Sequence, residues 1–261
     1  MNVTLARKEV TDLRRSRLLV ALVGAFVLFL VTTALGVPAD SSEPAAALLV
    51  NSADGLRVIS VVAILLGALA MVDEVETGRV RVLLGCPVTR RDVLLGKLLG
   101  RGLALVAATA VGFLAGGAVV AARLGSVDPV GLAAVTGQAL GFALAYFGIA
   151  FGLSVFVTDR LYSVGASFGA FLFFGSPWEV FVVGPPYWLQ YGRIPSSSDL
   201  VSVAADPAWY TLLTWASPNR ALAAFQTVSG PPVLFLVAVL LFWFVAPVAV
   251  GYWRFRSADI S

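Results

Sequence analysis

The sequence contains no histidine and only one cysteine, Cys86. Without histidine the chain cannot build a Ser-His-Asp or Cys-His catalytic group, a histidine-ligated metal site or a histidine proton relay. A single cysteine forms no intrachain disulfide and no thiolate cluster for zinc or for iron and sulfur. These absences exclude most hydrolases, most metalloenzymes and disulfide-stabilised secreted domains.

Charged residues are also scarce, at 13% of the 261 residues, whereas 59% are hydrophobic and the mean hydropathy is +0.91. Soluble domains carry roughly a quarter charged residues, so this composition predicts an integral membrane protein. Six spans of about 20 residues would use roughly 120 residues and leave too few for a separate catalytic domain of ordinary size. We therefore expect one all-α transmembrane domain over residues 1–261.

The predicted spans lie at about 18–37, 56–72, 98–122, 130–157, 161–183 and 232–253. Each is close to the length that crosses a hydrocarbon core of about 30 Å. In residues 1–17, apolar side chains spaced by three and four predict an amphipathic helix in the membrane interface, with a short solvated tail as the alternative. The second span is followed by a charged connection over 73–97, and the fifth by a long connection over 184–231.

The long connection, 184–231, is rich in proline, which forbids one continuous helix through it. Within it, residues 218–227 favour a short helix, with Leu222, Ala223 and Phe225 facing the membrane. Two interpretations remain open for the whole connection: a structured lid over an exit path, or an outer loop without a special role.

The positions of lysine and arginine predict the orientation, because these residues are enriched on the cytoplasmic side of membrane proteins. With six spans, 14 of the 18 basic residues lie on the side of the two termini, whereas the acidic residues divide 8 to 7. Both termini are therefore expected in the cytoplasm, in the cell (plasma) membrane. The use of 16 Arg against 2 Lys suggests a GC-rich prokaryotic genome.

The interiors of the predicted spans lack charged residues near their midpoints. Ion-coupled carriers usually need such groups, so a proton- or sodium-driven carrier is disfavoured. Gln138 is the most polar side chain inside a span and is expected to form an interhelical hydrogen bond rather than to bind substrate. Arg101 is placed where its side chain can reach the head groups. Glycine pairs four residues apart predict close helix packing, at Gly112 and Gly116, Gly137 and Gly141, Gly148 and Gly152, and Gly165 and Gly169.

The connection 73–97 is the most charged stretch, with 5 of the 18 basic and 4 of the 15 acidic residues. Its pattern predicts a helix, a break at 85–87 and a second helix that continues into the third span. Thr89 followed by Asp92 is a capping box for that second helix. A short amphipathic element between two helix ends is suited to docking on another protein at the membrane surface.

This connection resembles the corresponding loop of the membrane subunits of ATP-binding cassette exporters of the second permease type, close to the permeases of copper-processing and nitrous-oxide-reductase maturation systems. The matching residues are Glu74, Glu76, Gly78, Leu83, Leu84, Pro87, Val88, Thr89, Arg90, Asp92, Gly96 and Lys97. Arg79 departs from the usual threonine. The motif covers about 25 residues, and the six-span layout extends the likeness over the whole chain.

The resemblance implies an ABC transporter permease that exports its cargo and a loop that couples the membrane helices to a separate ATPase subunit. The implied coupling residues are Glu74, Glu76, Gly78, Pro87, Thr89, Arg90, Asp92 and Lys97. Gly78 and Pro87 could equally shape the turn, and Lys97 could equally anchor its helix at the head groups. The implied partners are the cytoplasmic ATPase, a second permease copy (as a homo- or heterodimer) and membrane lipid, with no nucleic acid.

The chain itself lacks the phosphate-binding pattern Gly-x-x-x-x-Gly-Lys-Ser/Thr, because its one Gly-Lys pair, Gly96 and Lys97, is followed by leucine. It is therefore not expected to be an enzyme or to bind a cofactor or a metal; ATP and magnesium would be bound by the partner ATPase. The alternative function is a membrane scaffold or anchor that recruits a cytoplasmic partner and transports nothing. An intramembrane enzyme is the third interpretation, and few candidate acids or bases support it.

Overall fold

A computed structural model describes residues 17–38, 53–76, 89–193, 208–225 and 231–257, and within these ranges the chain forms helices and no strand. The helices are α2 (Arg17–Leu35), α4 (Ala53–Glu76), α6 (Arg90–Leu124), α7 (Pro129–Ser154), α8 (Arg160–Phe173), α9 (Ser176–Trp178), the π-helix η1 (Glu179–Val183), α10 (Gly184–Tyr191), α12 (Ala208–Trp215), α13 (Pro218–Ala224) and α14 (Val233–Ser257). The all-α prediction is confirmed for these residues. The predicted interfacial helix over 1–17 lies almost entirely outside them.

Five of the six predicted spans each overlap one helix, whereas the fifth overlaps α8, α9 and η1, and these helices differ in length and apolar character. Three are long and apolar enough to cross a membrane, at Arg91–Leu124, Pro129–Ser154 and Val233–Arg256. A fourth crossing is available if the bent pair Arg160–Phe173 and Ser176–Tyr191 is one span, whereas Val20–Leu35 and Val58–Val72 are shorter apolar helices. The chain is therefore a multi-pass membrane protein, and the number six remains a prediction.

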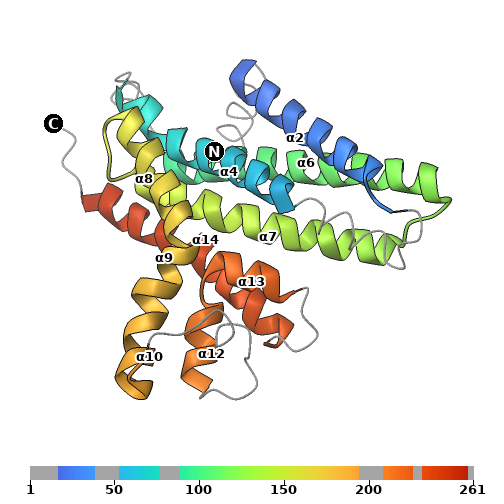
Figure 1. Cartoon of the computed structure of the whole chain (residues 1–261). Coiled ribbons are helices and arrows are strands. Elements are labelled where there is room, and N and C mark those ends of the chain that lie inside the picture. The colour runs from blue at the N-terminus through green and yellow to red at the C-terminus, as the bar shows by residue number, and fades with distance from the viewer. Residues whose placement is uncertain (1–16, 39–52, 77–88, 194–207, 226–230, 258–261) are drawn as a thin grey trace.

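Helix α7 occupies the middle of the bundle, with α4 along one face and α14 along another (Figure 1). Its start is fixed by Asp128, whose carboxylate accepts hydrogen bonds from the backbone N–H groups of Val130 and Gly131 at 3.1 and 2.7 Å. Pro129 follows at the first helical position, where its missing N–H group costs nothing. The N-terminus of the central helix is thus specified locally by the sequence.

Glycines allow α7 to approach both neighbours at backbone distance. A Cβ atom on Gly67 of α4 would lie 2.7 Å from the Phe147 carbonyl oxygen of α7. On the other face, a Cβ on Gly148 would lie 2.5 Å from the Phe244 carbonyl oxygen, and a Cβ on Gly152 would lie 2.4 Å from that of Pro247. The predicted packing role of the pair Gly148 and Gly152 is confirmed.

The other predicted glycine pairs behave differently. Gly112 of α6 faces α2, because a Cβ there would meet the Phe26 ring at 2.7 Å. At Gly137, Gly165 and Gly169 an added Cβ would have no other atom of this chain within 4 Å. For these three positions, the prediction of helix packing is not confirmed.

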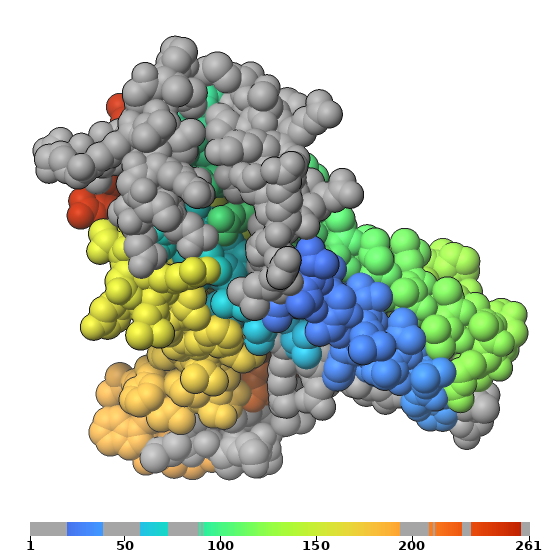
Figure 2. Space-filling view, turned by 90° about the horizontal axis from the view of Figure 1, so that it is seen from above, coloured from blue at the N-terminus to red at the C-terminus, as the bar shows by residue number. Residues whose placement is uncertain are grey.

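Helix α2 lies along α6 on one side of the molecule, while α8 to α10 lie on the other (Figure 2). Arg123, near the end of α6, donates hydrogen bonds from Nη1 to the carbonyl oxygens of Ala34 and Val37 at 3.1 and 3.2 Å. These carbonyls belong to the C-terminal end of α2, which a cation stabilises. Arg123 thereby fixes the far end of α2 to α6.

The predicted fifth span, 161–183, is interrupted at Gly175, where the chain bends by 63° between α8 and the helical stretch that follows. That stretch does not end at residue 183 as predicted but continues through η1 into α10, which ends at Tyr191. Pro185 and Pro186 do not stop it, because they occupy the first turn of α10, where a backbone N–H group would have no partner within that helix. The connection predicted for 184–231 therefore begins with a helix.

Candidate functional site

The predicted coupling connection, 73–97, joins the end of α4 to the start of α6. Glu74 and Glu76 lie in the last turn of α4, and Arg90 is the first residue of α6. Gly78, Pro87 and the predicted break at 85–87 lie outside the described residues. The structure therefore places the two ends of this connection on packed helices, since α4 and α6 are in contact.

The predicted capping box is present at the start of α6. The Thr89 Oγ1 accepts a hydrogen bond from the Asp92 backbone N–H, and the Asp92 carboxylate accepts from the Thr89 backbone N–H, both at 3.2 Å. The Thr89 hydroxyl also donates to Asp92 Oδ2 at 2.6 Å. These bonds use two donors that every helix start leaves unpaired, so they fix where α6 begins.

Loss of this cap is expected to loosen the first turn of α6. The variant Thr89→Ala should cost about 1 kcal/mol locally, which corresponds to roughly fivefold faster amide exchange over residues 90–93. Hydrogen–deuterium exchange of the purified chain measures it. Thr136→Ala is the matched control, because its hydroxyl donates within α7 to the Leu132 carbonyl and caps no helix. Unchanged exchange at residues 90–93 would contradict the capping role.

Lys97 and Arg101 lie four residues apart on one face of α6, and both are buried, at 2% and 7% exposure. Arg101 donates from Nη1 to the Leu66 carbonyl oxygen of α4 at 2.9 Å. The expectation that Arg101 reaches the head groups is therefore wrong, because a backbone carbonyl of the neighbouring helix accepts its hydrogen bond. Lys97 is likewise enclosed by the chain. The spacing of four on an otherwise apolar helix was the sequence signal that could have indicated this shared face.

A second polar cluster, here called the junction, surrounds α13 at the bend that follows α8. The Arg220 guanidinium forms an ion pair with the Glu179 carboxylate of η1, with Nε at 2.6 Å from Oε1. Both side chains are partly buried, at 28% and 21% exposure. Ser217 directly precedes α13, and its hydroxyl donates to the Phe174 carbonyl at the end of α8 at 2.9 Å.

Three further bonds join the junction to other helices. The Tyr146 hydroxyl of α7 donates to the Asn219 side-chain oxygen at 2.6 Å. The indole N–H groups of Trp178 and Trp243 donate to the Leu213 and Ala216 carbonyls at 3.2 and 2.8 Å. Residues 213–220 thus contact α7, the bend after α8, and α14 at once.

The short helix predicted for 218–227 is present as α13, which ends at Ala224. Its predicted orientation is wrong for Leu222, which is 6% exposed and packs inside the protein. The sequence did not indicate the junction, because its partners lie about 25–75 residues apart in the chain and no local pattern joins them.

The described residues bring together no group of three or more His, Cys, Asp or Glu side chains that could hold a metal ion. Their polar groups are instead used between helices, at the start of α6 and at the junction. Such an arrangement joins neighbouring helices to one another.

The amino-acid sequence is similar to those of known membrane transport proteins. The family model described as ABC-2 family transporter protein matches residues 3–260. A protein of Pseudomonas aeruginosa named "Probable ABC transporter permease protein NosY" is 28% identical over 263 residues, which cover 84% of this chain and 95% of that protein. A protein of the same name from Stutzerimonas stutzeri is 32% identical over 183 residues, which cover 65% of each.

Proposed function

This chain belongs to the ABC-2 family of transporter proteins, and from that premise we propose that it exports its cargo by coupling to ATP hydrolysis on a separate subunit. Membership makes the chain the membrane subunit of an ABC transporter, a role that is not itself catalytic. We propose three further properties: the direction of transport, the coupling role of the connection 73–97, and assembly with a second permease.

The observation that carries the coupling proposal is the unbroken length of α6. The helix has 35 residues, which at 1.5 Å per residue gives about 52 Å. A bilayer with its head groups is about 40–45 Å thick, so α6 is long enough to project beyond it. The capped end at Thr89 then lies at or beyond the membrane surface, and a displacement there moves the whole helix.

Packing supports the spread of such a displacement through the bundle. The Arg101 bond to Leu66 joins α6 to α4, and the close contact at Gly67 joins α4 to α7. The close contacts at Gly148 and Gly152 then join α7 to α14. A partner that pulls on the 73–97 connection would thereby move four helices as one unit.

In this proposal the connection 73–97 docks on a cytoplasmic ABC ATPase, which binds the ATP and magnesium. Glu74, Glu76 and Arg90 contact the ATPase, Gly78 and Pro87 shape the turn between the helices, and Thr89 with Asp92 holds the start of α6. Lys97, being buried, acts by positioning α6 within the chain rather than by touching the partner. Both termini and this connection are cytoplasmic, as the arginine distribution predicts, and a second permease copy completes the transporter.

Charge reversal tests the docking. In the complex assembled with its ATPase, Glu76→Lys combined with Arg90→Glu should lower the stimulated ATPase rate at least about tenfold, because like charges would face each other at the interface. The ATPase alone should keep its basal rate. The matched control is Asp199→Lys with Arg193→Glu, which makes the same charge changes in the connection 184–231. Full stimulation by the first double variant would overturn the proposed coupling site.

A further inference from the structure

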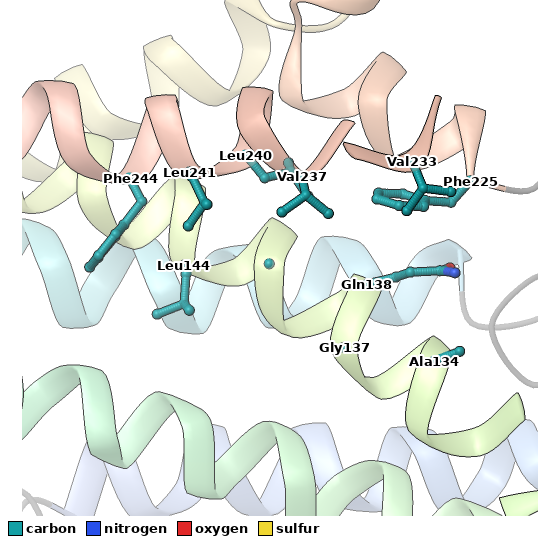
Figure 3. A pocket seen from close by; sticks show the side chains of 11 residues that line it. Ala134, Gly137, Gln138, Leu144, Phe225, Val233, Val237, Leu240, Leu241 and Phe244 are labelled. Atoms are coloured by element: carbon teal, nitrogen blue, oxygen red, sulfur yellow. The ribbon is translucent and has the colours of Figure 1, made fainter. Parts of the chain in front are cut away.

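Helices α7 and α14 touch at one end and separate at the other. Around Gly148 and Gly152 their backbones are in contact, whereas between Gly137 and Val237 a groove of about 540 Å³ remains (Figure 3). Phe225 closes one end of this groove and Phe244 lies at the other. Helices in proteins pack closely and leave few gaps of this size unfilled, so we expect another molecule to fill the groove.

The groove has an apolar lining with one polar group. Its walls are formed by Ala134, Gly137, Gln138, Gly141, Leu144, Phe225, Val233, Val237, Leu240, Leu241 and Phe244. No charged side chain is among them. Several wall residues of α14 are largely exposed, including Val233 at 64% and Leu241 at 54%, which opens the groove to the lipid phase in a membrane-embedded chain. We propose that the groove binds one acyl chain of a membrane phospholipid.

The length of the groove fits an acyl chain. From Val233 to Phe244 the groove follows α14 for about 16 Å at 1.5 Å per residue, which is close to half of a hydrocarbon core of about 30 Å, the depth of one leaflet. An extended hydrocarbon chain that enters from the outer end of α14 can follow the groove over this length.

Gln138 supplies a polar contact for the same lipid. Its side chain is half-buried, lies in the groove wall and points toward the Phe225 end in Figure 3. It makes no hydrogen bond with another residue of the described ranges, so the expected interhelical bond is absent. An amide carries two donors and an acceptor, and leaving them unpaired in an apolar setting is costly. The ester carbonyl or phosphate oxygens at the top of the acyl chain can accept from it.

Photolabelling tests the proposal on the full chain in nanodiscs that contain a phosphatidylcholine with a diazirine in its acyl chain. After irradiation, peptide mapping should find about tenfold more label on residues 134–144 and 233–244 than on the exposed α8 residues Leu161 and Leu172, a ratio equivalent to about 1.4 kcal/mol. Gly137→Leu, which fills the groove, should remove this excess. Gly165→Leu is the matched control, because it adds the same side chain at an equally open glycine outside the groove.

The polar contact has its own variant. Gln138→Leu should leave the label within the groove but reduce the number of phospholipids that remain bound during native mass spectrometry. Equal labelling of the groove and α8 in the unmodified chain would overturn the proposal. Efficient dimer formation through a Val237→Cys disulfide, with Cys86 replaced by Ser, would also overturn it in favour of a second copy. None of these three measurements involves the ATPase, so their outcomes are independent of the proposed transport function.

Discussion

Replacing Arg220 or Glu179 by alanine is expected to destabilise the folded chain by about 2 kcal/mol and lower its apparent Tm by roughly 4–8 °C. The variant leaves one partly buried charge without its partner beside the bend at Gly175. We expect a smaller loss of stability than the roughly 3–5 kcal/mol typical of breaking fully buried pairs, because about a quarter of each side chain remains exposed. Thermal unfolding of the purified chain in nanodiscs measures the shift.

The same pair offers a test of its role beyond stability. The exchanged variant, Glu179→Arg with Arg220→Glu, should recover at least half of the lost Tm because it restores an ion pair between η1 and α13. Arg193→Ala is the control, since that arginine lies over the Tyr187 ring at 5.4 Å and its loss should cost about 0.5–1 kcal/mol. If the exchanged variant is no more stable than the single ones, the pairing is not what holds the junction together.

Replacing Gly152 by leucine is expected to have the second large effect, with a loss of about 3 kcal/mol or more and a sharp fall in the yield of folded protein. The first atom of the new side chain would lie 2.4 Å from the Pro247 carbonyl oxygen, and backbone atoms cannot give way as a flexible side chain can. Helices α7 and α14 would have to separate along their whole contact. Size-exclusion chromatography and thermal unfolding measure the effect.

The matched control for this prediction is Gly165→Leu, where nothing lies within 4 Å of the added Cβ. That variant should fold with an apparent Tm close to that of the unmodified chain. Equal destabilisation by the two variants would mean that the cost arises from general loss of glycine in a helix and not from the close approach of α7 to α14.

The features that the sequence predicted correctly are those fixed by neighbouring residues. Thr89 and Asp92 are three apart, so their capping box could be recognised and the start of α6 placed to the residue. The apolar runs located the helices, because lipid selects for continuous apolar segments. The spacing of Gly148 and Gly152 likewise indicated a packing face, although the same spacing at Gly165 and Gly169 did not produce one.

The features that escaped prediction depend on residues distant in the chain. Local rules did not show that the helical stretch after the bend at Gly175 would continue through Pro185 to Tyr191. Arg101 was expected to reach the head groups. Its partner is instead the Leu66 carbonyl, a backbone group of another helix that no local pattern indicates. The junction combines residues from α7, η1, α13 and α14, and the pairing of Glu179 with Arg220 depends on how those helices fold together.

The most direct test of the central claim is purification of the full chain from its native membrane in a mild detergent, followed by quantitative mass spectrometry of the bound proteins. If the chain is the membrane subunit of an ATP-driven transporter, an ABC ATPase should co-purify in equal amount with the permease. The complex should hydrolyse ATP, and the Glu76→Lys with Arg90→Glu variant should recover far less ATPase. Recovery of the chain with a cytoplasmic partner that binds no nucleotide would contradict the account and support a scaffold.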